Sequence, residues 1–358
     1  MSIALKTTKF NSRQQPKITE PDNTTKRSSQ KVFLWEGGLI VGLLLSFLLA
    51  LSFGRGRFQS GDFWAIFHWQ DISPLQKTIL FQVRMPRVTL ATLVGGGLSI
   101  SGAVLQGLFR NPLVDPYILG ISSGASFGAV LAILKKWNFG LYAVPFSAFS
   151  FALLTTFLVF SLGQVNRKTP LETLLLSGVA VGFFFSALVS LSMFFAGHDL
   201  HQIVFWLMGG LWNRSWREVK MVLPFLSAGI PFMLAFHREL NIMLLGEKTA
   251  ESMGVDIERV KRWLVFACSL VVASCVAASG VIGFVGLIVP HVVRLLFGQN
   301  HRLLLPFSFL SGGIILLWAD TAARSILNPV ELPVGVITSL LGAPFFIYLL
   351  RKRKKLHG

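Results

Sequence analysis

Long apolar runs separated by short polar segments dominate the chain. A membrane-spanning helix needs roughly 17 to 25 mostly apolar residues, and residues 88–109, 141–164 and 173–197 each form such a run without a charged side chain. The same pattern, followed along the sequence, predicts an all-α integral membrane protein. Its ten transmembrane helices are expected at residues 32–53, 86–109, 117–134, 141–163, 172–196, 219–236, 260–278, 281–297, 303–320 and 334–350.

The least distinct boundary in this series lies at Ala278-Ser279-Gly280. Residues 263–290 are uncharged for 28 residues, which is too long for one comfortable span. With the following apolar residues the stretch has about the right length for two short helices joined tightly. We therefore predict two helices here, with the break at the glycine.

The two ends of the chain are polar. Residues 1–31 are rich in Lys, Arg, Ser, Thr and Gln, and the first apolar run begins only after them. Because a cleaved signal would place its apolar core much closer to the start, we expect a disordered cytosolic tail over 1–31 and a retained helix after it. The membrane domain then covers 32–350, and residues 351–358 form a short basic cytosolic tail.

Charge sets the expected orientation. The net charge is +17, yet the basic residues lie in short clusters between apolar segments rather than on a basic domain, which argues against nucleic acid as a partner. Ten spans starting with the tail inside place 22 of the 33 lysines and arginines on the cytoplasmic side, as the positive-inside rule requires. Both termini are therefore expected in the cytoplasm of a multi-pass inner (plasma) membrane protein, with segments two to five and seven to ten forming two inverted four-helix units.

The sequence shows no catalytic constellation. It lacks the G-x-x-x-x-G-K-[ST] loop that cradles nucleotide phosphates, and no carboxylate cluster or His-x-x-x-His pair falls inside a span. We therefore expect no enzyme, no bound cofactor and no resident metal, so that any energy must come from a partner. His198, Asp199 and His201 favour a polar loop over a metal site, and Cys268 and Cys275 favour packed thiols.

Small residues and prolines add two local expectations. Gly120, Gly124 and Gly128 recur at a spacing that lets helix backbones approach closely in lipid, which we favour over a surface that lines a transport path. The connection at residues 110–116 carries two prolines that end one helix and start the next. Within it, Asp115 has two open roles, pairing with Arg110 or capping the following helix.

The longest inside loop, residues 237–262 (coupling portion 237–258), has an unusual pattern for a solvated linker. Residues 249–253 favour a short helix that ends at Gly254. An apolar face is available from Leu244, Leu245, Ala250 and Met253. Two explanations remain open, a helix lying beside the membrane and a helix that docks on a cytosolic protein.

Several long, ordered stretches carry a resemblance to a known family. They are RMPRV (84–88), SGAVLQGLFRNPLVDPYILGISSGAS (101–126), FWLMGGLW (205–212), LGEKTAESMGV (245–255), SGVIGFVGLIVPHVVRLLFG (279–298) and ELPVGVITSLLGAPFFIYLL (331–350). With them the chain resembles the FecCD permease subunits of type II ABC importers, which carry iron–siderophores, haem and vitamin B12. The tail, residues 1–31, is longer than such permeases usually need.

The resemblance implies an assembly around this chain. A second copy or close relative would complete the path, two ATP-binding subunits that use ATP and Mg would dock inside, and an extracytoplasmic substrate-binding protein would deliver cargo. By the same resemblance, the coupling element that seats in the ATPase comprises Leu245, Gly246, Glu247, Ala250, Met253 and Gly254. Docking of the binding protein is implied for Arg84, Arg87 and Arg324, whose rigid fork can hold a carboxylate with two hydrogen bonds. The alternative is that these side chains snorkel at helix ends or pair with lipid phosphate.

Three functions are compatible with these patterns. A permease for a bulky metal chelate ranks first, with iron–siderophore as the expected cargo and haem or vitamin B12 as alternatives. A stand-alone secondary transporter or channel would call for intramembrane ionisable residues or a selectivity filter, neither of which is clear in the sequence. The third is a membrane anchor whose inner loop only recruits a soluble partner.

Overall fold

The computed structural model describes residues 23–53, 74–137, 140–166, 168–327 and 330–357. The chain divides into two units, Met1–Gly38 and Leu39–Gly358, and the following account concerns the second. Helix α1 (Asn23–Ser52) begins within the stretch predicted as a tail, while residues 1–22 lie outside the described part.

Helices make up the described structure, together with one isolated β-bridge between Val165 and Lys168. Within the described residues, seven helical segments are long and apolar enough to cross a membrane: Leu34–Ser52 of α1, Pro74–Leu108, Gly140–Gly163, Leu171–Phe194, Trp216–Ala235, Ile257–Ser279 and His301–Ser325. The last four are α7, α9, α12 and α14. Pro74–Leu108 consists of α3 (Pro74–Thr78), the π-helix η1 (Ile79–Arg84) and α4 (Met85–Leu108), and Gly140–Gly163 of η3 (Gly140–Tyr142) and α6 (Ala143–Gly163).

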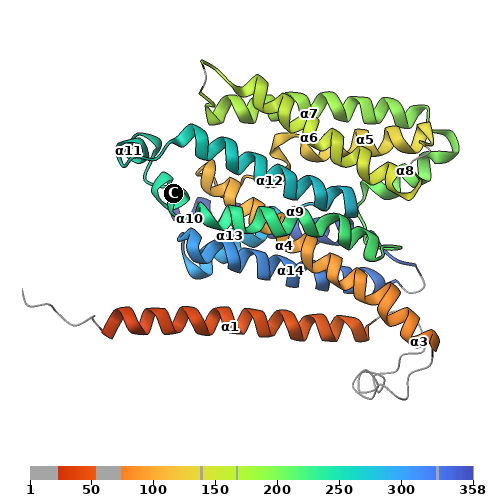
Figure 1. The fold of residues 1–358 in the computed structure, drawn as a ribbon, viewed down its shortest axis with the longest axis horizontal. Coiled ribbons are helices and arrows are strands. Elements are labelled where there is room, and N and C mark those ends of the chain that lie inside the picture. The colour runs from red at the N-terminus through yellow and green to blue at the C-terminus, as the bar shows by residue number, and fades with distance from the viewer. Residues whose placement is uncertain (1–22, 54–73, 138–139, 167, 328–329, 358) are drawn as a thin grey trace, which may run out of the picture. The chain divides into compact units, whose positions relative to one another are not determined.

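Three apolar helices are shorter, α5 (Ile121–Lys135), α13 (Val285–Phe297) and the apolar part of α15 (Val334–His357), Val334–Tyr348. The remaining elements are η2 (Pro116–Leu119), η4 (Gly197–Asp199), α8 (Leu200–Leu207), α10 (His237–Met243) and α11 (Glu247–Ser252). The long helices of Leu39–Gly358 run side by side, with α10, α11 and the C-terminus at one end and α3 and α8 at the other (Figure 1).

Each of the ten predicted segments coincides with one of these helices, although ten spans and their orientation stay predictions. Two helices begin about four residues later than expected. α5 is preceded by η2, whose N-cap Asp115 accepts a hydrogen bond from the Tyr117 N–H at 2.8 Å, so the capping role is the one observed. Burial raises the pKa of the Asp115 carboxyl to about 6, and this backbone hydrogen bond opposes the rise.

The predicted break between α12 and α13 is confirmed. α12 ends at Ser279, and Gly280 (φ +70°) and Phe284 (φ +68°) both have positive φ on either side of a short non-helical stretch. Its backbone is satisfied from elsewhere, because the Tyr117 hydroxyl bonds both the N–H and the carbonyl of Ile282 at 3.2 and 2.9 Å. Such pairing is what irregular backbone needs at membrane depth.

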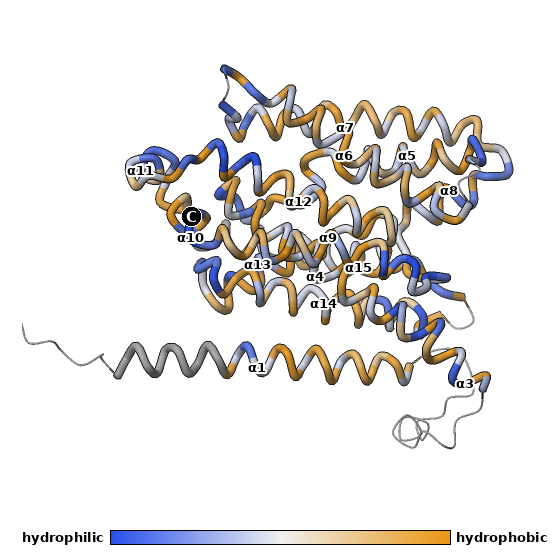
Figure 2. Tube along the Cα trace, viewed as in Figure 1, coloured by the Kyte–Doolittle hydropathy of each residue, from blue (hydrophilic) through white to orange (hydrophobic). Residues whose placement is uncertain are grey.

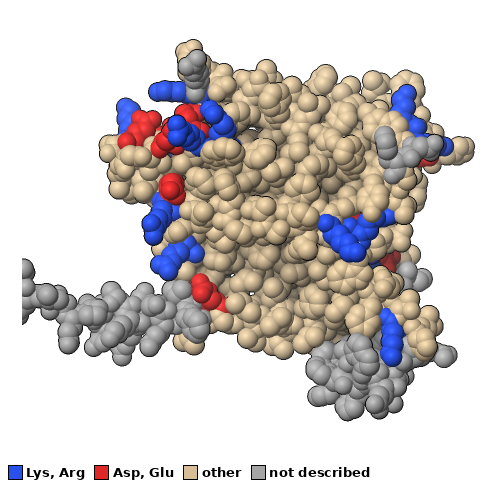
Figure 3. All heavy atoms as spheres, viewed as in Figure 1, with Lys and Arg blue, Asp and Glu red and all other residues tan. Residues whose placement is uncertain are grey.

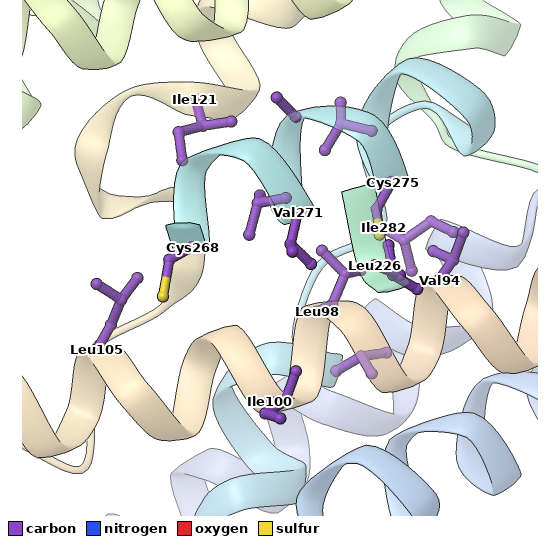
Figure 4. Packing of buried hydrophobic residues seen from close by; sticks show 14 of the residues in the cluster. Val94, Leu98, Ile100, Leu105, Ile121, Leu226, Cys268, Val271, Cys275 and Ile282 are labelled. Carbon is purple, nitrogen blue, oxygen red and sulfur yellow. The ribbon is translucent and has the colours of Figure 1, made fainter. Parts of the chain in front are cut away.

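Helix α4 is the most enclosed helix and packs against α9, α12, α13 and α14. Cys268 and Cys275 of α12 are fully buried in this core, near Leu98 and Leu105 (Figure 4). The prediction of packed thiols is confirmed. The tight packing of α5 is confirmed as well, since a Cβ at Gly124 would lie 1.9 Å from Thr155 Oγ1 and one at Gly128 2.5 Å from the Ser147 carbonyl on α6.

Polarity follows the helix ends. Apolar residues dominate the middle of the helices, and the polar ones concentrate toward their termini and connections (Figure 2). On the face shown in Figure 3, the charged side chains likewise gather toward the two ends and leave an uncharged band between them. This distribution suits a bilayer, whose hydrocarbon interior penalises charge.

Candidate coupling and docking sites

The segment between α9 and α12 folds into two short helices at one end of the molecule. α10 is joined through Leu244–Gly246 to α11, and Gly254 follows as a left-handed residue with φ +84°. The predicted end of the short helix at Gly254 is confirmed, since a residue without Cβ adopts this conformation at little cost. Gly246, directly before α11, also has a positive φ of +113°.

The expected apolar face on this segment is divided in the structure. Ala250 is fully buried, whereas Leu245 and Met253 are 66% and 57% exposed and Leu244 is half-buried. The prediction that all four residues share one face is wrong. α11 packs the face that carries Ala250 against the rest of the protein, and Leu245 and Met253 point away from it. Two large apolar side chains are left facing outward at the ends of α11, where they are available to a partner.

Glu247, the first residue of α11, forms an ion pair inside the chain. Its Oε1 lies 3.0 Å from Nζ of Lys261 on α12. The sequence analysis did not single out Lys261, which is only 2% exposed. Its position gave a signal, because it stands at the start of an apolar run between two other basic residues, Arg259 and Arg262, which are exposed in the structure.

The three predicted docking arginines meet at the opposite end of the helices. The Arg84 Nη1 donates to the Leu51 carbonyl at 2.7 Å, and the Arg324 Nη2 donates to the Ala50 carbonyl at 2.8 Å. Arg87 Nε donates to both carboxylate oxygens of Asp320 at 3.1 and 2.9 Å. Arg84 at the end of η1 and Arg324 on α14 therefore both bind the end of α1, while Arg87 on α4 binds Asp320 on α14.

Two carboxylates that the sequence analysis did not assign complete this arginine cluster. Arg87 Nη1 donates to Glu331 Oε2 at 2.8 Å, and Asp320 Oδ2 also lies 3.8 Å from Nε of Arg324. Three guanidinium groups and two carboxylates leave one net positive charge. A carboxylate in an apolar helix requires a partner, and Asp320 stands four residues before Arg324, a spacing that places the two on one helix face. The sequence therefore offered a basis for predicting this ion pair.

Burial limits what the arginine cluster can contact. Arg84, Arg87 and Arg324 are 3, 8 and 5% exposed, whereas Glu331 is partly exposed. An incoming carboxylate would therefore have to take the place of Glu331 or of a carbonyl partner. Docking stays a prediction, and the observed role of the three side chains is to join η1 and α14 to α1, and α4 to α14.

The described residues contain no candidate metal centre. No group of three or more His, Cys, Asp or Glu side chains there is arranged to hold a metal ion. In the segment around His198, Asp199 Oδ2 instead lies 4.0 Å from Nζ of Lys136.

A family model for the FecCD transport family matches residues 42–352, which include both sites and every helix that packs between them. The chain belongs to the FecCD transport family. The resemblance inferred from its motifs is thereby confirmed.

The FecCD chain has several characterised relatives. It is 48% identical to the cobalamin import system permease protein of Halobacterium salinarum over 278 residues, covering 78% of this chain and 74% of that one. It is 38% identical to the Fe(3+)-citrate import system permease protein of Bacillus subtilis, covering 87% and 94% of the two chains. A solved inward-facing structure of an ABC transporter described as of metal-chelate type matches with a TM-score of 0.79 at 38% identity, covering 88% of this chain and 98% of that one.

Proposed function

We propose that this FecCD chain is the transmembrane permease subunit of an ABC importer for a metal chelate. The observation that carries the proposal is the family match, which covers residues 42–352. Relatives that are named as import system permeases support it. Seven helices able to cross a membrane support it. The chain forms the path, and partner subunits hydrolyse ATP with Mg.

The cargo is the finer part of the proposal, and the relatives divide over it. The relative that is 48% identical imports cobalamin, while permeases for Fe(3+)-citrate and iron(3+)-hydroxamate are 38 and 42% identical. Sequence reasoning favoured iron–siderophore, and the higher identity favours cobalamin as the second candidate. Both are bulky chelates of a transition metal, which a path between two permease chains could admit.

The proposed assembly gives each site a partner. Two copies of the chain, or one copy and a close relative, would enclose the path in the inner membrane with ten spans each and both termini in the cytoplasm. Leu245, Met253 and the intervening α11 would contact the ATPase subunit, and Arg84, Arg87 and Arg324 would receive the binding protein. The placement of these two groups at opposite ends of the helices supports this division.

An uptake experiment tests the proposal. The chain is reconstituted in liposomes with its cognate ATP-binding subunits and binding protein, and radiolabelled cobalamin, iron–hydroxamate, Fe(3+)-citrate and haem are compared. We expect uptake of one chelate that requires enclosed ATP and the binding protein. Uptake by the chain alone, driven by an ion gradient, would instead indicate a secondary transporter, and absence of uptake with a stably bound ATPase would indicate an anchor.

A further inference from the structure

A buried lysine joins α11 to two other parts of the protein. Nζ of Lys261 lies 3.0 Å from Glu247 Oε1 on α11 and 3.5 Å from Glu258 Oε1 on α12. It also donates to the carbonyl of Thr169 at 3.2 Å, just before α7. An ammonium group has three N–H donors, and here each has a partner from a different segment.

Two of these partners also bind each other. The Thr169 N–H donates to Glu258 Oε2 at 2.9 Å, so that Lys261, Glu258 and Thr169 form a closed ring of polar contacts. Lys261 and Thr169 are almost completely buried. Glu247 lies outside this ring and connects α11 to it through Lys261 alone among the described ion pairs.

α11 is a short helix that packs mainly against α10 and α12 among the helix contacts of the described residues. It has six residues and is bordered by Gly246 and Gly254, whose positive φ angles glycine adopts with little strain. α12, by contrast, packs against α4, α5, α6 and α9, and α7 packs against α5 and α6. A displacement of α11 that is passed to Lys261 therefore reaches the helices packed around α12 and those packed around α7.

Ordinary explanations account poorly for a lysine in this position. Arg259 and Arg262 beside it are exposed and supply the positive charge typical of a cytosolic helix end, whereas Lys261 is turned inward. Nor is stability a sufficient reason, because a buried ammonium loses its hydration and a well-packed apolar side chain is often as stable. What the ammonium provides is a fixed position between three segments.

We propose that Lys261 is the positioning residue that transmits movement of α11 to α12 and to the start of α7. The inference rests on the proposed function, in which α11 contacts an ATPase subunit. It adds a defined route for that contact: Glu247 moves with α11, and Lys261 passes the movement to the ring with Glu258 and Thr169.

The test uses the full importer in liposomes and compares ATP hydrolysed per cargo molecule imported. In Lys261→Met we expect the ATPase subunits to remain bound while this ratio rises by about tenfold, because among the three lost contacts the charge-assisted one to Glu247 is the one that links α11 to the coupling step. Lys261→Arg, which retains the charge, should keep the ratio within about twofold of the unsubstituted importer. An unchanged ratio in Lys261→Met would overturn the inference.

A second pair of variants covers the case in which Lys261→Met does not fold. Glu247→Gln changes only a partly exposed residue and should raise the ratio, whereas Arg259→Gln, which removes an exposed charge on α12 outside the segment that contacts the ATPase, should not. Equal effects of the two would overturn the inference, because they would show a general effect of charge at this end of the protein.

A double variant separates transmission through Lys261 from independent effects. Glu247→Gln with Lys261→Met should be no worse than Lys261→Met alone, since both act through one contact, and additive losses would contradict this. If the unsubstituted chain does not bind an ATPase subunit at all, the proposed function fails, which is a different outcome from normal coupling in the Lys261 variants.

Discussion

Arg87 and Asp320 form a buried ion pair where α4 meets α14, with Nη2 2.9 Å from Oδ1 and two further hydrogen bonds from Nε. The residues are 233 positions apart in the sequence. An unpaired charge in this buried environment would lower the stability of the fold. Each side chain therefore offsets the desolvation cost of the other. Asp320 also faces Arg324, so one carboxylate holds two of the three arginines in place.

Asp320→Asn should destabilise the chain severely. The substitution keeps the shape of the side chain but leaves the Arg87 charge without its main partner, and breaking a buried pair in this way costs about 3 to 5 kcal/mol. Denaturation of the purified chain in mixed micelles measures the loss. Glu331→Gln is the control, because Asp320 still neutralises Arg87 and we expect a loss of less than about 1.5 kcal/mol. Equal stability of both variants would show that the pair is not needed for the fold.

Arg84→Glu combined with Arg324→Glu should weaken docking of the binding protein while the ATPase subunits stay bound. Opposite charges at these positions would repel a partner carboxylate, most strongly at low salt where screening is weakest. Titration of the binding protein onto importer in nanodiscs at two salt concentrations measures the effect. Lys220→Glu, an exposed position, is the control for a general change of charge. Unaltered affinity in an intact double variant would remove the docking role.

Leu245→Ser combined with Met253→Ser should reduce binding of the ATPase subunit. Both side chains are exposed in the isolated chain, and burying each in a partner would contribute roughly 1.5 to 3 kcal/mol. Co-purification of the ATPase with tagged permease provides the measurement. Leu327→Ser is a matched control, since Leu327 is also exposed but follows the far end of α14. If α11 instead lies on the membrane surface, the double variant will bind the ATPase normally.

Gly102→Ala should disrupt the contact between α4 and α13. A Cβ at Gly102 would lie 1.8 Å from the Gly286 carbonyl oxygen, so the helices would have to separate, at a cost of at least about 1 to 3 kcal/mol. Gly182→Ala makes the same change on α7, where the nearest atom, Ser123 Oγ, is 3.7 Å away. The yield of folded, monodisperse protein should fall for the first variant only, and equal yields would mean that the helices can separate at little cost.

The sequence by itself determined the helical membrane architecture and the family. Because lipid offers backbone N–H and C=O groups no partner except those of their own helix, long apolar runs predict α-helices. The break before α13 followed from Gly280 and from the length of the apolar run. The ending of α11 at Gly254 and the tight contact at Gly124 were predictable for a similar reason, since each depends on a local property of glycine.

Only the tertiary structure decided which charges meet. Arg87 is paired with Asp320 and with Glu331, 244 residues away, and Lys261 is bonded to Thr169, 92 residues away. Such pairs depend on which helix faces turn toward each other, and nearly uniform apolar helices carry little periodic signal for that choice. The same reason explains why Ala250 points inward while Met253 points outward, because the packing of α11, rather than its pattern, sets its rotation.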